Sequence, residues 1–452
     1  MSDIIKNVKK TINAWALFDW ANSAYALVIS TAIFPIFFIA NTEPVINIGS
    51  LSFTNSSLWT FAVSFSYIII AFITPLLSGM ADYSGRRMFF LKIFTVLGSL
   101  SCIALYYFKG VPQLWLGTTA FILATIGFAG GIVFYNSYLP LIVTEDRLDK
   151  VSAKGFAAGY IGSVILLLFI LWMVMSPNTF SIPGETEDIQ INNASRIGFV
   201  LVGVWWIIFG FISFHNLPKD KRLFSEDNLL MKGYQEIKKV YAELQTQPEI
   251  KKFLWSFFFY SAGVQTIIYV ATVFAKIILG FESSEMIAIV LVLQLVGIVG
   301  AYFFAYLSDI IGNKKSLIIM ILIWIVICLV AYVTTGKTLF YFLAGLVGMV
   351  MGGIQSLSRS TYSKMLNDKA EDVTSYFSFY DVLYKTSIVA GTLAYGAVDN
   401  LTGNLRYSVL VLGLFFVIGL IILFRTNLAV AMEDRPKAAT LASDTSNDIE
   451  LD

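Results

Sequence analysis

The chain has 452 residues, of which 57% are hydrophobic and only 13% are charged. Soluble proteins carry about 25% charged residues, so this composition excludes a chain of several water-soluble domains. The 31 basic and 30 acidic residues give a net charge of +1, which excludes the strongly basic surface of a nucleic-acid-binding protein. We therefore expect an all-α membrane protein that contacts the lipid bilayer and no nucleic acid.

Long apolar runs recur along the whole chain, and a membrane-crossing helix needs about 20 such residues. Six runs precede a charged central segment, at 20–42, 44–81, 93–108, 110–144, 155–184 and 197–218. Six more follow it, at 253–275, 286–308, 316–336, 338–358, 373–398 and 407–424. These runs predict twelve transmembrane helices, arranged as two pseudo-symmetric six-helix bundles.

The first span contains a carboxylate, Asp19, in the sequence WALFDWANSAY from Trp15 to Tyr25. A charged residue inside a span is costly and marks a substrate or coupling site by default. Asn22 and Ser23 follow at helical spacing and share its face. The alternative is that Asp19 lies near the cytoplasmic rim and pairs with a basic residue as a gate latch.

The loop after the second span has a counterpart after the eighth, offset by 227 residues. The first loop reads GMADYSGRR and contains Gly79, Asp82, Gly85, Arg86 and Arg87. The second reads YLSDIIGNKK and contains Asp309, Gly312 and Lys314. A repeat at equivalent places in two halves is typical of transporters. The glycine at the start of the first loop allows two helices to approach closely, and we expect its aspartate to accept hydrogen bonds from helix N-terminal amides or to pair with an arginine, as part of a gate.

Several polar residues lie within otherwise apolar spans and are candidates for lining a solute site. They are Tyr135, Asn136, Gln265, Tyr269, Gln294 and Gln355. Each has the alternative of an ordinary hydrogen bond between helices. Asp381 and Lys385 lie four residues apart in the eleventh span, so they form either an internal ion pair or a site in which the lysine meets an anionic solute group.

The basic residues predict the orientation and the domain boundaries. With the N-terminus inside, 25 of the 31 Lys and Arg residues fall in cytoplasmic segments and five fall outside. We expect an N-terminal bundle at 1–216, a cytoplasmic linker at 217–252, a C-terminal bundle at 253–425 and a disordered cytoplasmic tail at 426–452. The linker should contain an amphipathic helix at Leu229–Leu244 that lies along the membrane surface.

The first repeated loop resembles the signature of the major facilitator superfamily, G-x-x-x-D-x-x-G-R-[RK]. The WALFDWANSAY segment resembles the opening of the autophagy-related vacuole-effluxer family and its bacterial relatives. The resemblance implies the major facilitator fold, a conformational role for the loop, and amino acid export as a lead to the substrate.

We therefore expect a secondary active transporter that works by alternating access, coupled to protons or another ion, with amino acids or peptides as possible cargo. The alternatives are a polytopic membrane enzyme and a non-transporting receptor. One histidine and two isolated cysteines favour neither a metal nor a cofactor. We expect a monomer in a bacterial cytoplasmic membrane, with both termini inside.

Overall fold

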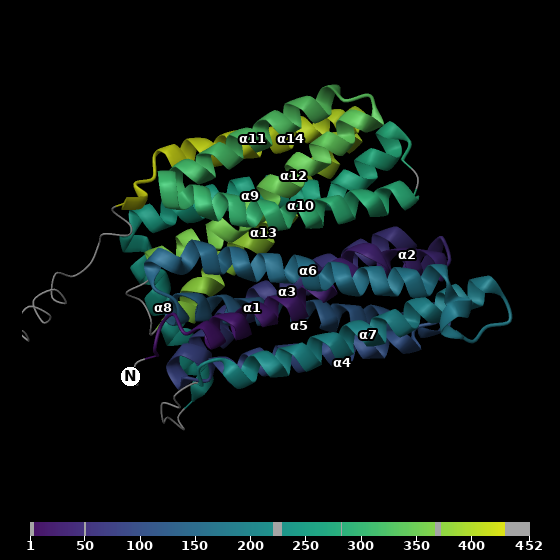
Figure 1. Cartoon of the computed structure of the whole chain (residues 1–452), viewed down its shortest axis with the longest axis horizontal. Coiled ribbons are helices and arrows are strands. Elements are labelled where there is room, and N and C mark those ends of the chain that lie inside the picture. Colours follow the sequence, from purple (N-terminus) through teal and green to yellow (C-terminus); the bar gives the residue numbers. More distant parts are fainter. Residues whose placement is uncertain (1–3, 49–50, 220–227, 282, 367–371, 430–452) are drawn as a thin grey trace, which may run out of the picture.

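Long helices that run side by side make up the described part of the chain, in two layers that follow the sequence (Figure 1). The computed structural model describes residues 4–48, 51–219, 228–281, 283–366 and 372–429. One layer holds α1 to α7 and the other holds α9 to α14, and we call them the first and second helix sets. Both layers lie with their helices nearly parallel, as expected where each helix satisfies its own backbone in lipid.

The first set follows the six predicted runs. Its helices are α1 (Lys9–Ala24), which continues through a π-helix (Tyr25–Ala32) into α2 (Phe34–Ala40), then α3 (Asn55–Ser84), α4 (Arg87–Ala104), α5 (Leu114–Ile142), α6 (Leu148–Met175) and α7 (Glu187–Asn216). Short 3₁₀ turns lie at Leu105–Tyr107, Val111–Gln113, Glu145–Arg147 and Pro177–Phe180.

The second set comprises six helices. They are α9 (Pro248–Leu279), α10 (Ser283–Ile311), α11 (Asn313–Val333), α12 (Lys337–Met365), α13 (Val373–Thr402) and α14 (Leu405–Phe424). Among the described residues ten helical segments are long and apolar enough to cross a membrane. The other two crossings are α9 and α13, with 32 and 30 residues. The predicted fold of twelve membrane helices in two six-helix sets is confirmed.

Two predicted spans were wrong in their details. The apolar run 44–81 is not one helix, because β1 (Val45–Ile48) and β2 (Leu51–Thr54) form an antiparallel hairpin before α3 begins. Span ten does not end at residue 358, because α12 continues to Met365. A run without charge does not distinguish a hairpin from a helix. A span defined by such a run also stops at the first charged residue, even where that residue is buried and the helix continues beyond it.

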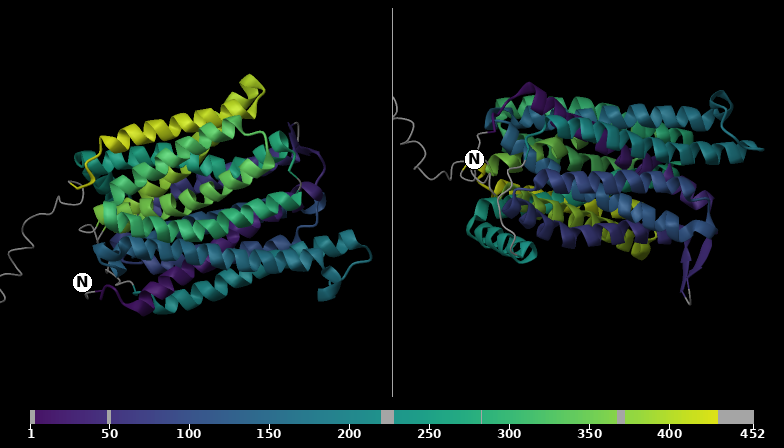
Figure 2. Two further views of the ribbon diagram at one scale, coloured as in Figure 1. Left: turned by 45° about the horizontal axis from the view of Figure 1, so that its top comes forward. Right: turned by 90° about the horizontal axis from the view of Figure 1, so that it is seen from below.

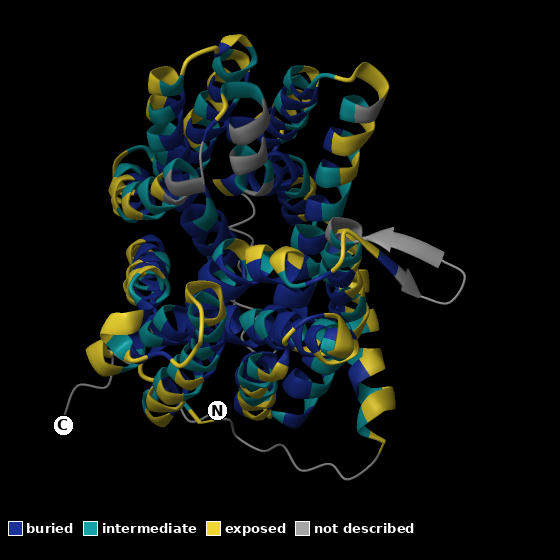
Figure 3. Cartoon of the chain, turned by 90° about the vertical axis from the view of Figure 1, so that its right-hand side faces the viewer, coloured by how far each residue is buried: buried dark blue, intermediate teal, exposed yellow. Residues whose placement is uncertain are grey.

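Apolar residues face both inward and outward, as expected for a protein in lipid. The indole rings of Trp15, Trp206 and Trp324 are fully buried, whereas Phe72 is 81% exposed and Trp115 is 70% exposed. Figure 3 shows buried residues gathered inside and between the helices and exposed residues around the rim. Such an outer surface of large apolar side chains would be unfavourable in water and suits the hydrocarbon of a bilayer.

In the sequence, α8 (Leu229–Thr246) follows the first set and precedes the second, in the segment where an amphipathic helix was expected. It sits at the end of the bundle where the described chain begins, outside the first set (Figures 1 and 2). We call this end of the molecule the α8 end. The expected disordered tail lies outside the described residues from position 430 onward.

The helix α8 packs closely on α3 through a pair of glycines. A Cβ on Gly79 would lie 2.2 Å from the carbonyl oxygen of Gly233, and a Cβ on Gly233 would lie 2.5 Å from a side-chain carbon of Met80. Both distances are shorter than any real contact. Gly79 therefore permits a close helix approach, and its neighbour is the linker helix.

The same helix also reaches the second set. Lys239 of α8 pairs with Asp372, just before α13, at 2.7 Å. The hydroxyl of Tyr376 on α13 donates to Glu243 at 2.7 Å. At the α8 end, α8 therefore contacts helices of both sets, namely α3 in the first and α9 and α13 in the second.

Candidate functional site

Arg359 is a charged side chain that α12 inserts among helices of the first set. It is 4% exposed. Its Nε and Nη2 donate to the hydroxyl and carbonyl oxygens of Ser152 at 3.0 and 2.8 Å. Its Nη1 lies 3.3 Å from a carboxylate oxygen of Asp19 and 3.3 Å from the side-chain oxygen of Asn136. These partners all belong to α1, α5 and α6, so Arg359 joins the two sets.

Three aromatic rings of the first set surround the guanidinium group. Its centre lies 4.2 Å from the ring centre of Phe156, 4.7 Å from that of Trp15 and 5.6 Å from that of Tyr135. Trp15 stacks on Tyr135 at 4.6 Å and donates its indole N–H to the Tyr135 carbonyl at 3.1 Å. Aromatic faces attract cations, most strongly where water is excluded. We call these residues the Arg359 socket; its members are Trp15, Asp19, Tyr135, Asn136, Ser152 and Phe156.

Asp19 is the anionic member of the socket. It follows Lys9 by ten residues, which places it about 15 Å along the helix from the α8 end. Its Oδ2 accepts a hydrogen bond from the Tyr135 hydroxyl at 2.8 Å and also faces Arg359. The side chain keeps 12% of its exposure. Asp19 is therefore paired with a basic residue of the other set and keeps a small exposed fraction of its side chain.

Glycines on α6 make room for the socket. A Cβ on Gly155 would lie 2.7 Å from the Trp15 ring and 2.8 Å from Oδ2 of Asp19. A Cβ on Gly159 would lie 2.4 Å from the hydroxyl of Ser23. The close approach of α6 to α1 thus depends on these two positions.

A second buried ion pair lies within α13. Lys385 and Asp381 are 2% and 4% exposed and form an ion pair. Lys385 also donates to the carbonyl of Ala129 on α5 at 3.3 Å. Ala129, which contacts Lys385, and Asn136, which contacts Arg359, are seven residues apart on one face of α5. Lys385 and Arg359 therefore lie about 10 Å apart along that helix. Both predicted charge sites thus occur at the interface between the sets.

The first repeated loop joins α3 to α13. Asp82 accepts from the backbone N–H and the hydroxyl of Ser375 at 2.7 and 2.8 Å, in the first turn of α13. Arg87 pairs with Asp82 at 3.0 Å and donates to Thr374 at 2.6 Å. A carboxylate at a helix N-terminus is stabilised by free amides and the helix dipole. Arg86 is exposed.

The second loop contacts α6 in a related way. Asp309 pairs with Lys150 at 2.7 Å, in the first turn of α6. The neighbouring Asp149 is buried, pairs with Lys364 of α12 at 2.7 Å and accepts from Asn313 at 2.9 Å. Polar contacts of both loops thus cross between the two sets at the α8 end, as hydrogen bonds from the first loop and as an ion pair from the second.

Both loops turn through a glycine with positive φ. The values are +64° at Gly85 and +85° at Gly312, a region that favours glycine. Lys314 takes a different role from its counterpart Arg87, since it donates to the carbonyl of Phe424 at the end of α14. The two copies therefore share their turn and their aspartate but not their basic contact.

The other predicted site residues are less concentrated. Tyr160 donates to Gln355 across the sets at 3.1 Å. Asn22 is buried with an unpartnered side-chain oxygen, and Gln265 is buried in α9. Gln294 is partly exposed in α10. The side chain of Tyr269 lies outside the described part of the structure.

Two buried charged residues at the interface between the sets, Arg359 and Asp149, were not identified from the sequence. Arg359 counted as a loop residue because it follows the apolar run 338–358, and Asp149 counted as part of a charged loop. No apolar pattern in the sequence identifies Arg359, because the segment from Ser360 to Met365 that continues α12 is mostly polar.

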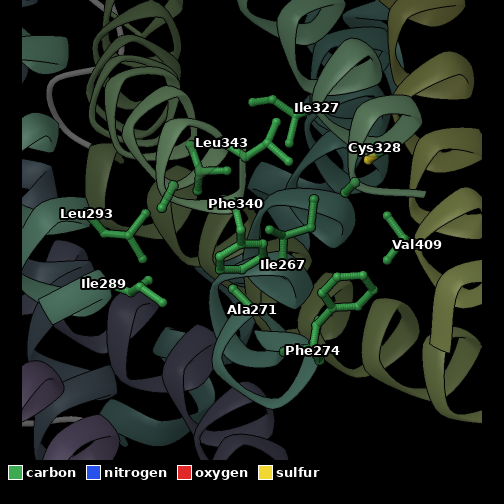
Figure 4. A pocket seen from close by; sticks show the side chains of 14 residues that line it. Ile267, Ala271, Phe274, Ile289, Leu293, Ile327, Cys328, Phe340, Leu343 and Val409 are labelled. Carbon is green, nitrogen blue, oxygen red and sulfur yellow. The ribbon is translucent and has the colours of Figure 1, made fainter. Parts of the chain in front are cut away.

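A pocket also lies within the second set, among α9, α10, α11, α12 and α14 (Figure 4). Apolar side chains line it, including Ile267, Phe274, Leu293 and Phe340, with Cys328 as the one thiol among its lining residues. It offers no charged group to orient a polar solute. Among the described residues, no three or more His, Cys, Asp or Glu side chains gather as a metal site would require.

Comparison with known proteins identifies the family. Residues 7–435 match the family described as "Vacuole effluxer Atg22 like". The chain belongs to this family. It is 30% identical over 421 residues to the "Uncharacterized MFS-type transporter YxiO" of Bacillus subtilis, which covers 93% of this chain and 95% of the relative. It is 23% identical over 440 residues to Autophagy-related protein 22-1 of Penicillium rubens, covering 77% of this chain and 71% of the relative.

Solved structures agree on the fold of this Atg22-like chain. The fucose transporter FucP in the outward conformation matches with a TM-score of 0.70 and 14% identity, over 93% of this chain and 99% of that one. The human organic anion transporter MFSD10 matches with a TM-score of 0.67 and 11% identity, over 92% of this chain. The chain is thus a multi-pass membrane transporter of the major facilitator superfamily, and its relatives are transporters rather than enzymes.

Proposed function

We propose that this protein is a proton-coupled secondary transporter that carries a small amino-acid-like solute by alternating access. Asp19 and Arg359 carry this proposal, because their ion pair is buried, joins the two sets and leaves the Asp19 side chain 12% exposed. A proton on Asp19 would cancel its attraction for Arg359. Gain or loss of one proton would therefore change the free energy of holding the two sets together.

The gating role of the repeated loops is part of this proposal. Asp82, Arg87, Asp309 and Lys150 all make contacts at the α8 end. These contacts would hold that end closed and would separate when it opens. A transporter needs such reversible polar contacts at each end in turn.

The positive-inside bias supports an orientation with the α8 end in the cytoplasm. Most Lys and Arg residues lie in the segments at this end, including the central linker. The relative in Bacillus subtilis suggests a bacterial cytoplasmic membrane, and the monomeric chain already contains both sets. The family description as a vacuole effluxer supports export as the physiological direction. Amino acids or short peptides are the cargo that the sequence resemblance suggests.

The test is solute flux in liposomes under an imposed pH gradient, with labelled amino acids and short peptides. Asp19→Asn should abolish dependence on the gradient, since the neutral amide cannot exchange a proton. Asp146→Asn is the matched control, because that carboxylate is 74% exposed outside the interface. Flux that is unaffected by the gradient in the wild type, or equally coupled in Asp19→Asn, would refute the proposed coupling.

A further inference from the structure

The Arg359 socket is a complete cation-binding site that the first helix set builds by itself. Its three rings come from α1, α5 and α6, and the guanidinium centre lies 4.2 to 5.6 Å from their ring centres. A carboxylate and an amide oxygen face the cation at 3.3 Å, and a backbone carbonyl does so at 2.8 Å. The second set contributes the cation and none of these contacting groups.

The socket must change its occupant if the two sets separate at the α8 end. Arg359 belongs to α12 and would move with the second set, whereas Asp19 would stay with the first. A buried carboxylate that loses its partner is strongly destabilising, because its charge is left uncompensated. The vacated socket therefore favours another cation of similar shape. This argument rests on the proposed alternating access.

We propose that the vacated socket binds the ammonium or guanidinium group of the transported solute, so that solute and Arg359 occupy it in turn. The rings of Trp15 and Phe156 would cover the apolar faces of the bound cation. The carboxylate of Asp19 and the carbonyl of Ser152 would accept its N–H groups. The site thus selects solutes that carry an amine or guanidine and excludes those that carry only a carboxylate.

The geometry of the present ion pair supports replacement of Arg359. Charge-assisted hydrogen bonds between N–H donors and carboxylates are usually 2.7–2.9 Å long. Arg359 approaches Asp19 at 3.3 Å through one nitrogen, while its shorter contact is to the Ser152 carbonyl. The arginine thus fills the socket without the optimal two-bond contact to the acid, and a free ligand could approach the carboxylate more closely.

The test uses methylguanidinium as a probe on the full-length protein in detergent, with the melting temperature as the readout. Arg359→Ala empties the socket, and methylguanidinium at millimolar concentration should raise the melting temperature of this variant by a few degrees relative to sodium at equal ionic strength. The wild type should not respond, because Arg359 occupies the site. The double variant Arg359→Ala, Asp19→Asn should lose the response. An equal response in all three proteins, or in none, would overturn the proposal.

A second variant covers the case in which Arg359→Ala does not fold. Ser152→Cys places a thiol at the socket, in a background where the buried native cysteines Cys102 and Cys328 are replaced by Ala. Ser152 is itself fully buried in this structure, so a reagent reaches the new thiol only when Arg359 leaves the socket. A cationic thiosulfonate reagent should modify this thiol faster than an anionic reagent of similar size, and Asp19→Asn should remove the difference. Equal rates for both reagents would contradict the proposal.

These measurements do not require transport, so they separate the socket from the proposed function. The flux panel then links the two. If the protein carries amine-bearing solutes and methylguanidinium inhibits their flux, the socket lies on the transport path. If it carries only solutes without a cationic group, the assignment is wrong even where methylguanidinium binds.

Discussion

Lys385 and Asp381 form either an internal ion pair or a solute-binding site, and measurements of stability and flux together distinguish these two interpretations. Both charges are buried, and each has the other as its charged neighbour within α13. Lys385→Met leaves the carboxylate unpaired, so we expect a loss of about 3–5 kcal/mol in the free energy of unfolding. The double variant Asp381→Asn, Lys385→Met should recover most of it. Thermal denaturation of the purified variants measures both effects.

Flux through the double variant then decides the role of the pair. If the stable double variant still transports solute, the pair only allows two charges to lie in the bundle. If it is stable but inactive, the lysine contacts the solute. A double variant as unstable as the single one would show that the two charges do not compensate each other.

Half of the charged site could be predicted at the residue scale. Asp19 was identifiable because a carboxylate within an apolar helix requires a reason. Its partner was not, because Arg359 follows Asp19 by 340 residues and falls where the apolar run seemed to end. A sequence pattern shows that burying the Asp19 carboxylate in an apolar helix is unfavourable. Which basic residue compensates that charge depends on how the two sets pack together, and the sequence pattern does not show it.

At the scale of elements, the contact between α3 and α8 depends on two glycines. Replacing Gly79 or Gly233 by Ala forces a Cβ into contact with the opposite helix, at 2.2 or 2.5 Å. We expect each substitution to cost about 1–3 kcal/mol, as overpacking does. Gly345→Ala is the control, because nothing lies within 4 Å of a Cβ there. Limited proteolysis of the linker should increase in both variants and stay unchanged in the control; equal proteolysis in all three would contradict the prediction.

The contact between α8 and α13 should weaken as pH rises. Burial, and then a hydrogen bond with Asp372, raise the pKa of Glu236 from 4.5 to about 7. Because its pKa is raised, protonated Glu236 is favoured when α8 is docked. Its contribution to the stability of docking is complete below pH 4.5 and disappears as pH rises through about 7. Lys239 pairs with both carboxylates and limits the effect.

Hydrogen exchange of the α8 segment measures this dependence. Corrected for intrinsic rates, exchange in the wild type should increase between pH 5.5 and 8, and Glu236→Gln should show no such increase. Lys238→Gln, on the exposed side of α8, is the control and should behave as the wild type. An unchanged pH dependence in Glu236→Gln would rule out this carboxylate as its source.

Element boundaries were predictable only where composition changes with structure. The amphipathic pattern placed α8 within two residues of its observed end, because its apolar residues recur at helical spacing. The hairpin of β1 and β2 was hidden within a run without charge, because the absence of charge alone does not distinguish a strand from a helix, although Asn47, Ser52 and Thr54 interrupt its apolar residues. Likewise the neighbour of Gly79 could not be inferred, because no pattern in the sequence specifies which helix passes it.

At the scale of the whole molecule, the fold was predictable because the bilayer imposes it. Apolar runs of fixed length and the 227-residue repeat are enough to predict twelve helices in two sets. The conformation was not predictable, since both ends of a transporter must be able to close. In this structure Asp82, Asp149 and Arg359 make their contacts between the sets in the part of the bundle nearest α8.

A reversible covalent link across the α8 end tests whether this closed arrangement is one state of a transport cycle. Ser137 of α5 and Thr374 of α13 lie in different sets, with their hydroxyl oxygens 3.4 Å apart. The variant Ser137→Cys, Thr374→Cys should form a disulfide on oxidation, since this separation suits bridged side chains. Because the link prevents the two sets from parting, oxidised protein in liposomes should lose solute flux, and a reductant should restore it. Each single cysteine variant should keep its flux after oxidation, because Cys102 and Cys328 are buried. If the linked protein transports as fast as the reduced one, the α8 end does not open during transport, and the gating role of Asp82 and Asp309 would fall with it.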